Sequence, residues 1–332
     1  MNQTEYSRPG TSNMYTPRTS RMQERQRFDV SRPRLEEDEI DGLEELIGQT
    51  WNIYAASALF GFQQDDIHLK LYSKKLREEI ASTLSREDVT YETKFSIIED
   101  IASGSNYENH PAIKIEVVAK TNSHEKNVEK TIYKGILLSW KVTRTGQNIQ
   151  NSIRLPLLLC RGTRSCMDAV HSIIGCMFDC VIMALPAKEY DLNWLVPIII
   201  VANNEEDQPI VSGEVKMEYT VPELPVTDTI TIKFPTSDLR KILTVIIKDD
   251  NDKINISLNR EHIEMFHEVL HKQMLVLGGL HLGLCTLHKI NLPGITIMEN
   301  RMKVMNIEIM DNILMYLSER AFDIFHTVCF DI

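Results

Sequence analysis

The sequence predicts an α+β protein in which largely antiparallel sheet packs with amphipathic helices. In some segments apolar side chains recur at every second position, the period of a strand with one solvated face. In other segments they recur every three or four positions, as on one face of a helix. The two kinds of segment come in clusters rather than in strict alternation, which favours the α+β class.

The composition is that of an ordinary soluble globular chain. Of the 332 residues, 43% are hydrophobic and 25% are charged. The longest apolar runs are shorter than the ~18 residues of a membrane-spanning helix, and the polar N-terminus does not resemble a secretory signal. Six cysteines fit the buried, reduced thiols of a nuclear or cytosolic protein.

Residues 1–34 are expected to form a disordered basic tail. They contain seven arginines and three acidic residues, and they have too few aliphatic side chains to offset the entropy of ordering. Thr16 precedes Pro17 and is a candidate phosphorylation site. The tail either adds only solubility or contacts DNA or a partner.

The N-terminal α+β region, residues 35–160, begins with two predicted helices. An acidic run at 36–41 suits a helix N-terminus, and apolar residues up to Trp51 continue the first helical face through Ile40, Leu43 and Ile47. The second helix is marked by Leu69, Tyr72, Leu76 and Ile80. Period-two alternation then predicts strands at 91–97, 113–117 and 136–143, followed by a strand at 153–160.

The C-terminal α+β region, residues 161–332, opens with a predicted core helix. Its apolar face is marked by Met167, Val170, Ile174, Met177 and Val181. Ser165 and Asp168 fit a capping box, and Pro186 is expected to end the helical pattern. Residues 194–201 are almost wholly apolar and predict a buried strand or short helix.

The remaining elements follow the same reasoning. Alternation predicts strands at 215–221 and 230–234, and helices are expected at 235–247 and 259–277, the latter capped by Asn259. A further strand group is predicted from Leu280 to Leu284 and across residues 294–309. The last helix is predicted at 311–325.

One motif matches a catalytic pattern. His267-Glu268-Val269-Leu270-His271 has the H-E-x-x-H spacing in which zinc hydrolases place two ligands and a general base on one helix face. A third ligand is missing, because Met274 and Leu277 stand where the extended motif has Gly and His. We interpret the two histidines as lying at the border of an amphipathic helix, with a zinc hydrolase as the alternative.

Other clusters predict no metal, cofactor or catalytic site. Cys160, Cys166, Cys176 and Cys180 lack a C-x-x-C pair and are interpreted as small buried side chains, although a pairing of Cys166 or Cys176 with His171 stays open. Residues 249–260 lack the Gly and Glu of a calcium loop. No phosphate-binding or dinucleotide-binding glycine motif is present.

A local reversal of charge is the feature that most favours a binding function. The chain carries a net charge of −11, yet residues 119–165 contain nine basic residues against Glu125 and Glu129. Side chains on the solvated strand faces and following turns are candidates to line a groove that follows DNA phosphates. These candidates are Lys130, Lys134, Lys141, Arg144, Arg154, Arg161 and Arg164. The alternative is a solvated sheet face of mixed charge.

The order of several short segments resembles the centromere protein L family, whose members are subunits of the constitutive inner kinetochore. The matching segments are Leu46-Ile47, Trp51-Asn52-Ile53-Tyr54, Leu59-Phe60-Gly61-Phe62, Phe178-Asp179-Cys180, Leu192-Asn193-Trp194, the helix 264–274 with His281-Leu282, and Ile313-Leu314-Met315-Tyr316-Leu317 with Ala321 and Ile324-Phe325. Together they cover roughly residues 43–326 in order, and none has catalytic character.

The resemblance implies a nuclear, chromosome-bound, non-enzymatic protein that forms a heterodimer with centromere protein N. The pair binds the centromeric nucleosome and DNA together with other inner kinetochore subunits, and it supports kinetochore assembly and chromosome segregation in mitosis. The resemblance also implies dimerisation through a sheet edge in the C-terminal half, which we place at residues 294–309. Its candidate contact residues are Ile295, Ile297, Val304 and Ile307. The remaining alternative is an unrelated α+β binding module.

Overall fold

The computed structural model describes residues 27–30, 42–85, 88–98, 110–123, 126–142, 150–202, 213–225, 227–247 and 256–328. These residues form an α+β fold, as predicted. Among them, no helix combines the length and the apolar character needed to span a membrane.

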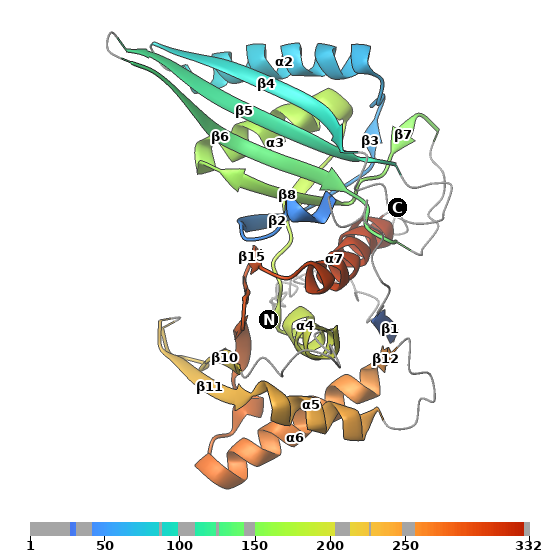
Figure 1. Ribbon diagram of the computed structural model, residues 1–332, viewed down its shortest axis with the longest axis vertical. Helices are drawn as coiled ribbons and strands as arrows, with labels where there is room; N and C mark the ends of the chain where they lie inside the picture. The colour runs from blue at the N-terminus through green and yellow to red at the C-terminus, as the bar shows by residue number, and fades with distance from the viewer. Residues whose placement is uncertain are drawn as a thin grey trace, which may run out of the picture.

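An antiparallel sheet of eleven strands runs through the molecule from end to end (Figure 1). Ten strands follow one another in the order β11-β10-β13-β14-β15-β2-β8-β6-β5-β4, and β9 also pairs with β2. In that order the strands are β11 (Thr229–Pro235), β10 (Glu214–Thr220), β13 (Thr286–Leu292), β14 (Ile295–Met298), β15 (Arg301–Val304), β2 (Thr50–Ala56), β8 (Leu157–Gly162), β6 (Lys126–Leu138), β5 (Ala112–Ser123), β4 (Val89–Ile98) and β9 (Ile182–Ala184).

Two helices cover one face of the N-terminal part of this sheet. They are α2 (Asp66–Leu84) and α3 (Arg164–Phe178), and α2 runs beside β4 at the end of the sheet (Figure 1). The predicted apolar stripe of α2 is confirmed, because Leu69, Tyr72, Leu76 and Ile80 are its buried residues. Asp65 caps this helix by accepting from the backbone N–H groups of Ile67 and His68.

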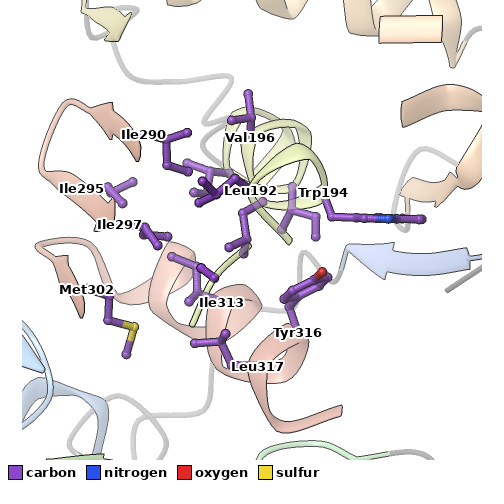
Figure 2. Packing of buried hydrophobic residues seen from close by; sticks show 14 of the residues in the cluster. Leu192, Trp194, Val196, Ile290, Ile295, Ile297, Met302, Ile313, Tyr316 and Leu317 are labelled. Carbon is purple, nitrogen blue, oxygen red and sulfur yellow. The ribbon is translucent and has the colours of Figure 1, made fainter. Parts of the chain in front are cut away.

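Four helices cover the C-terminal part. They are α4 (Glu189–Ala202), α5 (Thr236–Ile246), α6 (Arg260–Gly278) and α7 (Ile307–Val328). Figure 2 shows Leu192 of α4 lying between the sheet residue Ile290 and the α7 residue Ile313. The core therefore lies between the sheet and the layer formed by α4 and α7.

The middle of the sheet is buried on both faces. Leu157, Leu158, Leu159 and Cys160 of β8 are all fully buried. Leu157 and Leu159 belong to the hydrophobic cluster that contains α7, whereas Leu158 and Cys160 belong to the cluster that contains α2 and α3. β8 therefore joins the two clusters, and it spans the predicted boundary between residues 160 and 161.

The stretch 165–202 forms two helices with a strand between them. Helix α3 ends at Phe178 because Asp179 adopts a left-handed conformation with φ 45°, well before Pro186. The N-cap is Thr163 without a side-chain hydrogen bond, so the predicted Ser165 capping box is wrong. The apolar run becomes α4, a helix with nearly every side chain buried, and Pro197 lies inside it.

Several element predictions were wrong in ways that share one cause. Trp51 lies in strand β2 rather than on a helix, and Leu282–Leu284 form a 3-10 helix rather than a strand. Ile307 begins helix α7. Buried strands and buried helices are both dense in apolar side chains, so periodicity alone does not separate them over short segments.

The predicted disordered tail contains an ordered strand. Residues Arg27–Val30 form β1, which pairs antiparallel with β12 (Ile256–Asn259), and Phe28 and Val30 are buried. The prediction for residues 1–34 is therefore wrong for this segment. Thr16 lies outside the described residues. A third sheet pairs β3 (Leu59–Phe60) with β7 (Ser152–Ile153).

Candidate interaction surfaces

The predicted basic groove is divided among several local environments. Lys134 and Arg161 face each other across β6 and β8, and both cations lie near the ring of Trp51, at 5.8 and 5.7 Å from its centroid. Lys134 is only 7% exposed, and its Nζ lies 2.7 Å from Glu45 Oε1. These contacts make Lys134 part of the folded framework.

Glu45 is the acidic centre of this cluster. Its carboxylate also lies 2.5 Å from Lys114 Nζ. Burial acts to raise the pKa of Glu45, but the hydrogen bonds from Lys114 and Lys134 outweigh it and hold the pKa below its usual value. This face of β5 and β6 is therefore one of mixed charge. That is the alternative considered above for the basic window, the charge-reversed residues 119–165.

Lys141 anchors the end of the N-terminal sheet to α7. Its Nζ lies 2.8 Å from Asp311 Oδ1, and the same oxygen accepts a hydrogen bond of 2.8 Å from Trp140 Nε1. Asp311 is 1% exposed. The positive charge of Lys141 is therefore compensated within the fold.

The other window residues do not gather in one place. Lys130 is exposed on β6, and Arg164 is exposed at the start of α3. Arg154 is half-buried with its guanidinium 5.7 Å from the centroid of the Phe322 ring. Arg144 lies outside the described residues.

The predicted dimerisation edge is interior to the sheet. β14 pairs with β13 on one side and β15 on the other, and β15 pairs in turn with β2. Ile295, Ile297 and Val304 are at most 3% exposed and belong to the C-terminal core, where Figure 2 shows Ile295 and Ile297 beside Ile290. Placing a free edge at residues 294–309 was wrong, because β2, from a distant part of the chain, pairs with β15 and covers that edge.

The two edges of the described sheet are β11 and β4. β11 lies in the C-terminal half, where the resemblance implied an edge. Its Ile232 and Phe234 side chains are buried, while Thr231 and Lys233 are exposed. The alternation of apolar and polar residues predicted the strand β11, but nothing in the sequence indicated that this strand lies at the edge of the sheet.

A cationic surface that the sequence analysis missed lies on the outer face of β15. Arg301 and Lys303 are both exposed there, alternating with the buried Met302 and Val304. Neither has an ion-pair partner among the residues that the structure describes. Burial raises the pKa of Tyr54, Asp168 adds to the rise, and Arg164 and Arg301 act against it.

The H-E-x-x-H motif lies on α6 beside a cavity of about 540 Å³ between α4 and α6. His267 Nε2 is 3.0 Å from the backbone oxygen of Asn193, and because a carbonyl only accepts, this nitrogen carries the proton. Glu268 is exposed and pairs with Lys272 at 2.6 Å. The described residues contain no group of three or more His, Cys, Asp or Glu side chains that could hold a metal ion.

The cysteine–histidine alternative gains no geometric support. His171 packs edge-on against the rings of Tyr54 and Tyr133, at 4.5 and 5.9 Å between centroids. Burial lowers its pKa to about 4. Cys166 is buried and Cys176 is exposed, and the buried Nε2 of His171 has no hydrogen-bond partner, thiol or other, among the described residues.

The fold and these surfaces define an α+β protein whose described sheet ends at β11 and β4 and which exposes cationic side chains on strand faces, features that suit binding and assembly. The family model described as CENP-L, centromere protein L, matches residues 45–322. The chain belongs to the centromere protein L family, as its segments suggested. No curated protein matches the chain.

Family membership fixes the broad setting of this chain. It is a protein of the centromere and kinetochore, hence of the nuclear chromosome, and a member of the inner kinetochore complex with a role in chromosome segregation. The family is a structural one and is not a known enzyme family.

Proposed function

We propose that this chain is a non-enzymatic structural subunit of the constitutive inner kinetochore that pairs with centromere protein N. The pair binds centromeric chromatin and supports kinetochore assembly. The observation that carries the proposal is that β11 ends the sheet formed by the described residues and lies in the C-terminal half of the stretch matched by the family model. An edge strand offers unpaired backbone groups to a partner strand, which gives affinity, while alternating side chains give selectivity.

Proline substitution in β11 tests the pairing. Ile230→Pro and Thr231→Pro each remove one backbone N–H, and in a strand the two point in opposite directions. Loss of an N–H that bonds to β10 destabilises the sheet. The variant that keeps the natural melting temperature is therefore the one that has lost the outward-pointing N–H. We expect that variant to lose co-elution with co-expressed centromere protein N in size-exclusion chromatography.

Val89→Pro is the matched control, because it alters the first residue of the opposite edge strand, β4, where proline is tolerated. It should leave the complex intact. A heterodimer that survives the well-folded β11 variant and is lost on Val89→Pro would move the interface to the other end of the sheet.

We further propose that the heterodimer contacts DNA through Arg164, Arg301 and Lys303. All three side chains are exposed, and Arg301 and Lys303 lie on the same face of β15, which supports this surface. Lys134 and Lys141 are weaker candidates because both are already paired with carboxylates. Phosphate contacts of this kind add affinity without reading sequence.

The test is duplex binding by the heterodimer as a function of salt. Arg301→Glu combined with Lys303→Glu should weaken binding by at least about tenfold at low salt. It should also reduce the magnitude of the slope of log K against log salt concentration by about two. Lys130→Glu with Arg164→Glu tests the predicted window separately. Lys241→Glu with Lys272→Glu alters exposed lysines on helices α5 and α6 and should change little. Unchanged affinity in both test variants would contradict direct DNA contact by this chain.

A further inference from the structure

A groove of about 600 Å³ lies between helix α2 and the edge strand β4. The two elements run side by side at the end of the sheet (Figure 1). One wall is the helix, and the other is the segment of β4 from Thr93 to Ile97. No part of the β11 edge or the β15 surface lines this groove.

The helix wall is cationic. Lys70, Lys74 and Arg77 line the groove, and their spacing of four and three residues places them on one face of α2. Lys70 and Arg77 have no ion-pair partner among the described residues, and Lys74 reaches Glu78 only at 4.0 Å. Asp66 is the one acidic residue that lines the groove, at the first turn of the helix. The local charge is therefore positive in a chain whose net charge is −11.

The groove also offers apolar surface. Leu69 and Phe95 line it and are each 5% exposed, so they form a floor that is part of the core. On the outer face of α2, next to the cationic residues, Ile67 is 78% exposed and Leu71 is 57% exposed. Helical geometry puts Ile67, Leu71 and Lys74 on neighbouring positions of one face. Exposed apolar side chains grouped beside a charged groove mark an interaction surface.

Hydrogen bonds between the two walls fix the shape of the groove. The backbone N–H of Phe95 donates to Ser73 Oγ at 2.9 Å, and Thr93 Oγ1 donates to the backbone oxygen of Ser73. Ser73 Oγ in turn donates to the Leu69 carbonyl at 2.7 Å. Because α2 occupies the edge of β4 at Ser73, an incoming strand cannot pair along the whole of β4, and a ligand has to lie along the helix.

We propose that this groove binds an acidic segment of a partner protein that carries apolar side chains. Carboxylates of the segment pair with Lys70, Lys74 and Arg77, and its apolar side chains pack on Ile67 and Leu71. Charge complementarity selects an anionic partner. The apolar surface selects a peptide over DNA, because a phosphate backbone gives Ile67 and Leu71 nothing to pack against.

Fluorescence anisotropy with a labelled peptide of alternating Glu and Leu tests the proposal on the full chain. We expect binding that weakens about tenfold with Lys70→Glu combined with Arg77→Glu. A peptide of alternating Glu and Ser should bind markedly less well, and Leu71→Ser should remove most of the difference between the two peptides. Hydrogen exchange should show protection confined to α2 and β4 on addition of the Glu-Leu peptide.

Lys75→Glu is the matched control, because Lys75 is an exposed lysine of α2 that does not line the groove. It should retain peptide binding. The proposal is overturned if the peptide does not bind, if Lys75→Glu weakens binding as much as the groove variant, or if duplex DNA protects the same segments and ignores Leu71→Ser.

Discussion

Asp191→Ala is expected to lower the free energy of unfolding by about 3–5 kcal/mol, the usual cost of deleting one partner of a buried ion pair. Asp191 is 2% exposed at the start of α4, and its Oδ1 accepts from Tyr316 at 3.0 Å and from Arg320 Nε at 2.9 Å. Its Oδ2 accepts from the backbone N–H of Lys188 at 3.1 Å. One carboxylate thus joins α4 to α7 and satisfies a backbone donor before the helix.

Urea denaturation followed by tryptophan fluorescence measures this effect. Glu268→Ala is the matched control, because it breaks an exposed pair with Lys272, and such solvent-screened pairs contribute little to stability. Asp191→Asn should fall between the two, since the amide oxygen still accepts one hydrogen bond. Equal stability of Asp191→Ala and Glu268→Ala would mean that the buried pair does not hold α4 against α7.

Local periodicity was enough to predict the elements whose burial follows a regular pattern. The stripe of α2, the alternation of β4 and β10, and the cap of α6 at Asn259 all follow from residues close in sequence. In each case one side of the element meets the core and the other meets solvent. The pattern of side chains then specifies both the type of element and the face that is buried.

The position of each strand in the sheet could not be predicted in this way. Ile295 and Ile297 alternate as an edge strand would, but β15 pairs with β2, and that pairing joins residues 249 to 253 positions apart, such as Arg301 and Asn52. An edge strand is one that pairs with a neighbour on one side only. Which strand this is depends on the topology of the whole sheet. The same limit explains why β11 and the groove beside β4 were not recognised as surfaces.

The sequence identified where basic residues are concentrated along the chain, but not which of them are exposed and unpaired after folding. The basic window is real in sequence, but Lys134 and Lys141 are paired with Glu45 and Asp311, which come from distant segments. Arg301 and Lys303 lie outside the window and are exposed. Counting charges along the chain cannot separate a cation that meets a carboxylate after folding from one that remains available to a ligand.

Acidification from pH 6.5 to pH 4 is expected to remove about 3 kcal/mol of stability through His267 alone. Burial lowers the pKa of this histidine to about 4, with the proximity of His271 acting in the same direction, while the bond to Asn193 opposes the shift. The unfolded imidazole takes up a proton near pH 6.5, and the folded one does so only near pH 4. Between these values the unfolded state binds more protons, so stability is full above pH 6.5 and falls as the pH falls.

The buried Nδ1 of His267 provides the physical reason, because it has no hydrogen-bond partner among the described residues and would become an unpaired charged donor in the core. His267→Gln keeps a donor for the Asn193 carbonyl but cannot titrate. The difference in unfolding free energy between this variant and the natural chain should therefore change by about 3 kcal/mol across the interval. A constant difference across the interval would show that this imidazole is solvated or protonated in the folded protein.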